Sequence, residues 1–202
     1  MFTDRADAGR ALAAQLGEWR SEDAVVTGIA RGGVIVAAAV ARALGMPLAA
    51  VAVRKLGVPG HEEVALGAIA EGVRVLDERI AAATGTSSRE VARVEARERD
   101  VLRRRAALVG KLDAIGRPVL LVDDGIATGA TANAAGRAIR RAGAASVVLA
   151  VPVAPADWRP DPDAADDYVC LHPITDFWAV GSFYDDFRQT TDEDVARALN
   201  RG

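Results

Sequence analysis

The sequence of this protein predicts an α/β fold, in which an open, mostly parallel sheet is flanked by helices. Short apolar segments typical of strands alternate along the chain with segments whose apolar residues recur at helical spacing. The strand segments are hydrophobic at nearly every position, as expected where helices cover both faces of a parallel sheet. The 202 residues suffice for one sizeable core, so we expect a single domain over residues 1–202.

The composition is that of an ordinary globular protein, with 50% hydrophobic and 26% charged residues. A formal net charge of −3 argues against a surface devoted to nucleic-acid phosphates. No apolar run approaches the roughly 20 residues of a spanning helix, and the first ten residues are polar where a signal peptide is apolar. We therefore expect a cytoplasmic protein that binds neither membrane nor nucleic acid. The single cysteine, Cys170, excludes an intrachain disulfide and is expected in the core.

The alternation of elements begins near the N-terminus. Ala8, Leu12, Leu16 and Trp19 recur at spacings of three and four, which predicts an amphipathic helix lying on the sheet. Residues 24–45, AVVTGIARGGVIVAAAVARALG, are predicted to form a strand, a glycine-rich loop and a helix that ends at the last glycine.

A second buried strand is predicted at residues 48–53, so that Arg54 and Lys55 would lie at its carboxyl end. The segment 56–64, LGVPGHEEV, combines glycine, proline and polar residues and is predicted to be a mobile loop without secondary structure. Two short apolar stretches within residues 65–76 are predicted to return the chain as a hairpin.

A long charged helix is predicted next, over residues 88–109. Ser87, followed three residues later by Glu90, forms a capping box at its start. Its charged residues of both signs recur at helical spacing and indicate either a solvated face with ion pairs or a subunit contact. They are Arg89, Arg93, Glu95, Arg97, Glu98, Arg99, Asp100, Arg103, Arg104 and Arg105.

The rest of the chain continues the parallel α/β pattern. The predicted elements are a strand at 118–122, a helix at 131–142, strands at 146–151 and 168–171, and a last helix opened by Thr191 and Asp194.

The segment Val119 to Thr131, VLLVDDGIATGAT, carries the strongest functional signal. A buried strand ends in two adjacent carboxylates, and a loop of small residues then leads into a helix N-terminus. Backbone N–H groups of such a loop can converge on one phosphate, helped by the helix dipole and the threonine hydroxyls. The residues of this predicted phosphate cup are Ala127, Thr128, Gly129, Ala130 and Thr131.

The two carboxylates, Asp123 and Asp124, are suited to a different part of the ligand. Carboxylates accept hydrogen bonds from sugar hydroxyls and can neighbour a hydrated Mg²⁺. A ligand that carries both a phosphate and a diol would satisfy both halves of the segment. In open α/β sheets such ligands bind beyond the carboxyl ends of the strands, where the winding reverses.

This segment resembles the signature with which type I phosphoribosyltransferases bind 5-phosphoribosyl-1-pyrophosphate (PRPP). Only Ala130 departs from the usual pattern, in which glycine is commonest at that position. The resemblance extends over about three-quarters of the chain and implies a Rossmann-like sheet with a flexible loop hairpin and a small C-terminal hood. It places the core at about residues 1–155 and the hood at about 156–190, followed by the C-terminal helix.

The other pieces of the family appear in the expected order. Ala30, Arg31, Gly32 and Gly33 resemble the family's pyrophosphate loop, which often contains a special peptide geometry that would fall at Ala30–Arg31. Arg54 and Lys55 match the position from which cationic side chains reach the pyrophosphate, although solvated charges at a strand end are the alternative. The segment Gly57 to Glu63 resembles the family's flexible loop, which closes over PRPP as a lid. His61 within this segment is either a ligand contact or a solvated histidine.

The resemblance implies transfer of phosphoribose from PRPP to a nitrogenous acceptor, with release of pyrophosphate and no covalent nucleophile. Mg²⁺ would be held largely by PRPP and water, with Asp123 and Asp124 acting indirectly, and Asp124 is the candidate general base. A homodimer or larger homo-oligomer is expected. Candidates for stacking on a planar acceptor, or else for holding the hood on the core, are Phe177, Trp178, Phe183 and Tyr184.

Two other functions fit the same segment. One is a regulatory protein that binds PRPP or a nucleotide without chemistry, and the other is a hydrolase of phosphoribosyl compounds. Arg54, Lys55 and the lid candidate favour a transferase, because a pure sensor has less need of a leaving-group clamp. The acceptor is not identified by any pattern in the hood.

Overall fold

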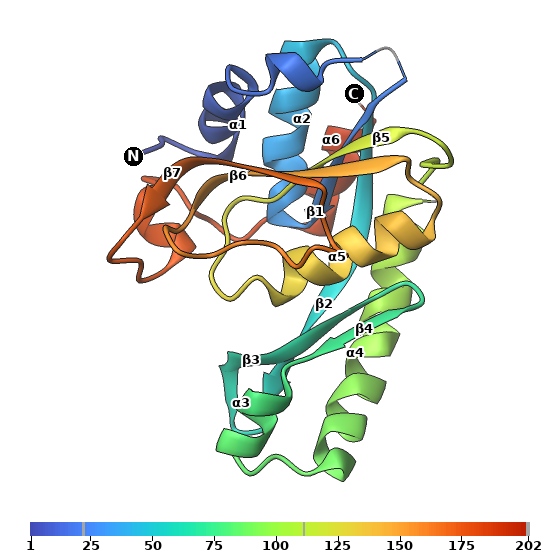
Figure 1. Cartoon of the computed structure of the whole chain (residues 1–202), viewed down its shortest axis with the longest axis vertical. Coiled ribbons are helices and arrows are strands. Elements are labelled where there is room, and N and C mark those ends of the chain that lie inside the picture. The colour runs from blue at the N-terminus through green and yellow to red at the C-terminus, as the bar shows by residue number, and fades with distance from the viewer. Residues whose placement is uncertain (22, 111, 201–202) are drawn as a thin grey trace.

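The computed structural model describes residues 1–21, 23–110 and 112–200, with the backbone alone at Glu63. Its centre is a seven-stranded sheet in the order β4-β3-β2-β1-β5-β6-β7 (Figure 1). Five strands are parallel and two, β3 and β4, are antiparallel, which confirms the predicted α/β class. The strands are β1 (Val25–Ala30), β2 (Leu48–Val58), β3 (His61–Ala70), β4 (Val73–Leu76), β5 (Pro118–Val122), β6 (Ser146–Pro155) and β7 (Asp167–Ile174).

Helices cover both faces of the parallel part of the sheet. Alternate residues of one strand reach opposite layers: Leu120 and Val122 of β5 pack towards α1 and α2, whereas Val119 and Leu121 pack towards α5. Figure 1 shows α1 and α2 on one side of the sheet and α5 on the other. The helices are α1 (Arg5–Ala13), α2 (Gly32–Leu44), α3 (Glu78–Ala83), α4 (Ser88–Val109), α5 (Ala130–Arg141) and α6 (Asp192–Leu199), with short 3₁₀ turns at Gly17–Trp19 and Val180–Phe183.

The predicted caps agree with the structure, but the first helix, predicted from Ala8 to Trp19, ends at Ala13, and a separate 3₁₀ turn follows at Gly17–Trp19. Ser87 and Glu90 form the capping box of α4, and Thr191 with Asp194 forms another at the start of α6. Gly45 ends α2 in the left-handed conformation with φ 67°. The short helix α3 was not predicted, because its six residues are too few for a periodic pattern. No helix within the described ranges is long and apolar enough to span a bilayer.

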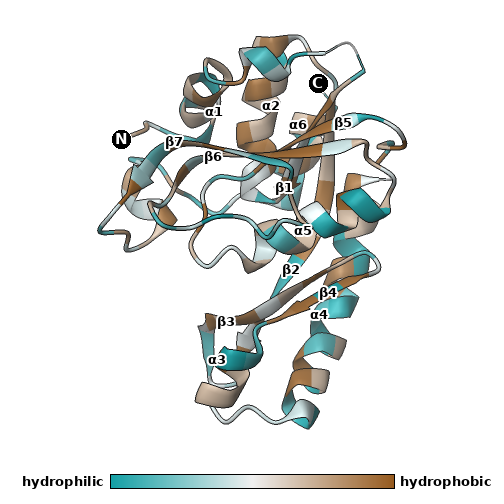
Figure 2. Ribbon diagram, in the orientation of Figure 1, coloured by the Kyte–Doolittle hydropathy of each residue, from teal (hydrophilic) through white to brown (hydrophobic). Residues whose placement is uncertain are grey.

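The prediction of a mobile loop at residues 56–64 is wrong. Strand β2 continues through this segment to Val58, and β3 begins at His61, so that only a tight turn separates the two. Leu56 and Val58 are buried in a cluster with residues of α4, and antiparallel pairing to β3 satisfies the backbone. The resulting arm of β2, β3, β4, α3 and the first part of α4 extends from the body (Figure 1). Its alternating apolar and polar residues appear in Figure 2.

The same extension changes the place of Arg54 and Lys55. They were predicted at the carboxyl end of a strand, but they lie in its middle, where β2 leaves the parallel sheet and pairs with β3. Consecutive strand residues point to opposite faces. Arg54 therefore faces α4, whereas Lys55 lies on the other face and is exposed.

The C-terminal part of the chain is joined to the sheet and to the N-terminus. Residues 167–174, assigned above to the hood, form the edge strand β7, which pairs in parallel with β6. Cys170 lies half-buried in this strand. The segment that follows crosses back to the N-terminus, where Phe2 forms a bridge with Tyr184. The N-terminal residues and the hood therefore form one layer over the same edge of the sheet.

Candidate functional site

The point where the winding of the sheet reverses brings two loops together. Strand β1 lies between β2 and β5, with Gly28 paired to Val122, so the carboxyl ends of β1 and β5 are adjacent. The loop from Ala30 to Gly33 leaves one of these ends and Asp123 leaves the other. In open α/β sheets this is the position where ligands bind. The sequence-predicted pyrophosphate loop and the two carboxylates are thus neighbours.

Glycine is required at two positions of the first loop, because the second loop passes so close. A Cβ atom on Gly33 would lie 2.7 Å from the Val122 carbonyl oxygen. A Cβ atom on Gly32 would overlap the Asp124 carboxylate and lie 3.0 Å from Nε of Arg5. The peptide bond between Ala30 and Arg31 is cis, at the position where the resemblance suggested a special geometry. The Gly-Gly pair therefore allows both loops to occupy one small volume.

The predicted phosphate cup lies at the N-terminus of α5. Gly129 is its N-cap residue in a left-handed conformation, φ 81°, and no side chain caps the first turn. The first N–H groups of α5 therefore receive no side-chain acceptor and can bind an anion. Ala127 and Thr128 of the preceding loop are exposed, while Ala130 and Thr131 are half-buried in the first turn. The five residues form one turn at the helix end, exposed at Ala127 and Thr128 and buried at Gly129.

Trp158, which the sequence did not indicate as a site residue, packs its indole ring against this turn at Gly129. A Cβ atom on Gly129 would overlap the indole ring of Trp158, which in turn makes an edge contact with Tyr168 at 5.3 Å between ring centroids. A tryptophan in a Pro- and Asp-rich segment carries no sequence signal for such a contact. Glycine is therefore needed at position 129 for two reasons: the backbone has a positive φ, and Trp158 leaves no room for a side chain.

We expect Gly129→Ala to destabilise the protein by about 2–4 kcal/mol, through roughly 1 kcal/mol of backbone strain and the rest from overpacking against Trp158. Gly60→Ala is the matched control, because Gly60 has φ 79° with nothing within 4 Å of its Cβ position. It should cost only the backbone share. Urea unfolding of both variants measures the difference, and equal losses of stability would contradict the contact with Trp158.

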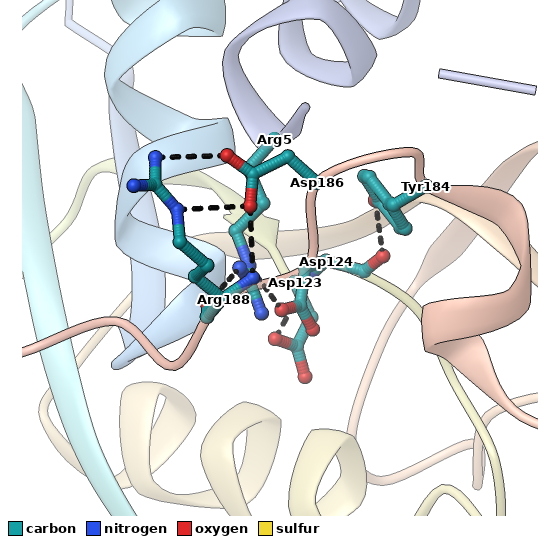
Figure 3. A network of polar contacts seen from close by, with 6 residues as sticks. All are labelled: Arg5, Asp123, Asp124, Tyr184, Asp186 and Arg188. Atoms are coloured by element: carbon teal, nitrogen blue, oxygen red, sulfur yellow. Dashed lines mark hydrogen bonds and ion pairs between the residues drawn. The ribbon is translucent and has the colours of Figure 1, made fainter. Parts of the chain in front are cut away.

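The two carboxylates differ in their partners (Figure 3). Oδ1 of Asp123 accepts a hydrogen bond from the Asp124 amide at 2.9 Å. Oδ2 of Asp124 accepts one from Nε of Arg5 at 2.7 Å, and the Asp124 carbonyl accepts one from the Tyr184 hydroxyl at 2.6 Å. Asp124 is thus held on three sides, while Asp123 has no cationic partner among the described residues.

Burial, together with the repulsion between the two carboxylates, shifts the pKa values of Asp123 and Asp124. Burial, followed by the charge of Asp124, raises the pKa of Asp123 well above its ordinary value. Burial also raises the pKa of Asp124, but the Arg5 guanidinium opposes this rise. Burial raises the pKa of Tyr184 too, so its phenol stays protonated and donates. The Arg5 guanidinium therefore favours the charged form of Asp124 most directly, while Asp123 has no such ion pair.

Arg5 is the site residue that the sequence could not indicate. Its guanidinium lies 3.9 Å from the ring centroid of Phe187, and its NH1 donates to the Arg188 carbonyl at 2.8 Å. Figure 3 shows it between the carboxylates and the segment that contains Asp186 and Arg188, which pair with each other. Arg5 lies 119 residues from Asp124 in the chain, so only the folded chain brings them together.

The predicted pyrophosphate cations lie in different surroundings. Arg31 forms a long ion pair of 3.5 Å with Asp192 at the start of α6. Arg54 donates to Glu98 of α4. Lys55 points to the opposite face of the sheet from Arg54. His61 lies exposed at the tip of the arm, where it pairs with Val58 across the turn.

The hood candidates fall into three environments. Phe177 and Phe183 stack on each other at 5.5 Å, and Tyr184 is buried with its ring against Phe2 and Phe187. Trp178 is 91% exposed. Phe177 and Phe183 are half-buried, so Trp178 has the most exposed of the four rings. Phe183 also lines an apolar pocket of about 370 Å³ together with Phe2, Val153, His172, Pro173 and Ile174.

A metal site built by protein side chains alone is not found in the described parts of the chain, where no three His, Cys, Asp or Glu residues come together. Asp123 and Asp124 supply two carboxylates at the sheet edge. This donor set fits a Mg²⁺ ion that takes its other ligands from water and from a phosphorylated substrate.

Comparisons with known proteins agree with this geometry. The family described as "Phosphoribosyl transferase domain" matches residues 2–188. A Mycobacterium tuberculosis protein named "Putative phosphoribosyl transferase" is 44% identical over 207 aligned residues, which cover 100% of this chain and 47% of that protein. The chain thus spans about half the length of the curated relatives it matches.

Solved structures show the same fold. The protein TT1426 from Thermus thermophilus is 43% identical, with a TM-score of 0.74 and coverage of 99% of this chain and 98% of that one. A hypothetical protein from Neisseria gonorrhoeae has a TM-score of 0.53 at 16% identity over 98% of this chain and 92% of that one, and this likeness concerns the fold alone. From the family match, the M. tuberculosis relative and the site at the sheet's reversal point, the chain belongs to the phosphoribosyltransferase family.

Proposed function

We propose that this protein transfers 5-phosphoribose from PRPP to a nitrogenous acceptor and releases pyrophosphate. The observation that carries the proposal is the convergence, at one reversal point of the sheet, of three ligand-binding features. They are the uncapped N-terminus of α5, the pair Asp123 and Asp124, and the Gly32–Gly33 loop. These match the 5-phosphate, the ribose diol and the pyrophosphate of PRPP, respectively.

The chemistry needs little from the protein beyond positioning and charge stabilisation. The bond from the anomeric carbon to the pyrophosphate oxygen breaks, and its electron pair leaves with pyrophosphate. A nitrogen of the acceptor then forms the new bond to that carbon and loses a proton. Backbone amides of the Gly32–Gly33 loop would hold the leaving group, while the carboxylates orient the ribose hydroxyls.

The proton acceptor is better assigned to Asp123 than to Asp124, which was the expectation from sequence. Asp124 is already engaged by Arg5 at 2.7 Å, whereas no ion pair engages Asp123 among the described residues, which leaves its carboxylate available to accept the proton. Mg²⁺, when bound, would neutralise charge on the pyrophosphate, with Asp123 and Asp124 holding it indirectly. The nature of the acceptor, a cytoplasmic location and a homo-oligomeric state stay predictions.

The test is turnover by the full chain. Pyrophosphate release should require Mg²⁺, PRPP and one member of a panel of purine, pyrimidine and other nitrogenous acceptors. Release at the same rate without any acceptor would instead identify a hydrolase. Binding of PRPP without release under any acceptor would identify a regulatory protein. Failure to bind PRPP at millimolar concentration would contradict the proposal.

A further inference from the structure

The buried face of α4 contains two charged positions. Val91, Val94, Glu98 and Leu102 are the buried residues of this helix, and they recur at spacings of three and four. The same spacing continues to Arg105 and then to Val109, one turn later. Because the apolar members of this row pack against the arm and the body, the two charged members also face the protein.

Glu98 is paired with two arginines, Arg54 and Arg97, and Nε of Arg97 donates to its Oε1 at 3.1 Å. Nε and NH2 of Arg54 both donate to Oε2 of Glu98, at 2.8 and 2.6 Å. Glu98 is only 7% exposed, and the paired cations offset the cost of burying its carboxylate. This pair lies where β2 leaves the parallel sheet, one strand away from the loop after β1.

Arg105 has no such partner. It is half-buried, yet no carboxylate within the described ranges forms an ion pair with it. Val109, the next residue of the same row, packs in a cluster with Ala30 and Val34, which flank the candidate pyrophosphate loop. The end of α4 that contains Arg105 therefore lies beside this loop.

The charges around Arg105 do not balance. Burial, followed by the nearby guanidinium groups of Arg54 and Arg31, lowers the pKa of Arg105, and Asp192 and Glu98 oppose this only in part. Arg105, Arg54 and Arg31 thus face two carboxylates, Asp192 and Glu98, and Glu98 also accepts from Arg97, so arginines outnumber carboxylates in this partly desolvated place. An excess cation gains little there from the protein itself and is suited to an anion that arrives with a ligand.

We propose that Arg105 is a pyrophosphate-binding residue, which joins Arg31 and Arg54 to hold the leaving group from the side of α4. The assignment rests on the proposed function and deepens it. When the bond to the anomeric carbon breaks, negative charge grows on the departing pyrophosphate, and a guanidinium already in place stabilises that charge. Under this proposal, Arg105 of the charged helix 88–109 binds a ligand and does not belong to the solvated face expected for that helix.

The test compares Arg105→Met with Arg104→Met in the full chain, because Arg104 is exposed on the same turn. The probes are Mg²⁺-pyrophosphate and ribose 5-phosphate, measured by isothermal titration calorimetry. Loss of a charge-assisted contact should weaken pyrophosphate binding by Arg105→Met about 10- to 100-fold. Ribose 5-phosphate lacks the pyrophosphate and should bind unchanged. Arg104→Met should bind both probes like the wild type, and Arg105→Lys should recover part of the loss.

The melting temperature separates a contact from a structural role. Arg105→Met should melt at the same temperature as the unliganded wild type or higher, because the substitution removes a cation repelled by two neighbours. Unchanged pyrophosphate affinity in this variant would overturn the assignment, as would an equal loss of both probes. If the wild type binds PRPP and pyrophosphate while Arg105→Met matches it, only the role of Arg105 fails. If the wild type binds neither, the proposed function fails as well.

Discussion

Replacing Asp123 and Asp124 together by asparagine should weaken the binding of Mg²⁺-PRPP by about a hundredfold or more. Each hydrogen bond between a charged carboxylate and a ribose hydroxyl contributes about 1.5–3 kcal/mol, and about 1.4 kcal/mol corresponds to tenfold in affinity. The substitution also removes both charges that could neighbour Mg²⁺. Calorimetric titration of the double variant with Mg²⁺-PRPP measures the effect, and wild-type affinity would remove the basis of the proposed function.

The single variants should have opposite effects on the stability of the unliganded protein. Asp123 has a raised pKa in the folded state, so its contribution to stability is present at low pH and is lost as the pH rises through that pKa. Asp123→Asn should therefore be more stable than the wild type at neutral pH, by a margin that shrinks on acidification. Asp124→Asn should be less stable, because it leaves the Arg5 guanidinium without its carboxylate. Urea unfolding between pH 5 and pH 8 distinguishes the two.

Replacing Arg5 by methionine should destabilise the protein by about 2–4 kcal/mol at neutral pH, near the lower end of what breaking a buried ion pair costs. Its side chain is 11% exposed, and it joins Asp124, Phe187 and the Arg188 carbonyl. Without this guanidinium the pKa of Asp124 should rise further, so the loss of stability should be larger at pH 8 than at pH 5. Urea unfolding at the two pH values measures this dependence.

Arg10→Met is the matched control for that experiment. Arg10 lies on the same helix and pairs with Asp7, but its side chain is 63% exposed, and exposed pairs contribute about 0–1 kcal/mol. A loss as small in Arg5→Met as in Arg10→Met, or one independent of pH, would contradict the role of Arg5. In folded Arg5→Met, Mg²⁺-PRPP binding should also weaken at acid pH, because without Arg5 the Asp124 carboxylate is protonated at a higher pH than in the wild type.

The sequence was a reliable guide to structure wherever local pattern and tertiary environment agree. The strand Pro118–Val122 and the helix that follows it were predicted to within one residue, because continuous hydrophobicity, a small-residue loop and helical spacing all indicate the same elements. The capping residues Ser87 and Thr191 were equally clear, since their side chains bond to backbone three residues away.

Pattern failed where a distant partner decides the conformation. Residues 56–64 contain Gly57, Pro59 and Gly60, which by themselves indicate a loop. Pairing with β3 and burial of Leu56 and Val58 under α4 make most of this segment strand, and the glycine and proline are accommodated at a bulge and a two-residue turn. A single-sequence pattern contains neither the partner strand nor the covering helix.

By itself, the sequence determined the class of the fold, the family resemblance and the segment Val119 to Thr131 with its two carboxylates and its loop of small residues. Each of these depends on residues close together in the chain. Only the tertiary structure decided that Arg5 pairs with Asp124, that Arg54 and Lys55 point to opposite faces, and that Arg105 lies beside the Ala30–Gly33 loop. Burial and charge pairing act through space, so only the folded chain decides which carboxylate pairs with a cation and which cation has no carboxylate partner.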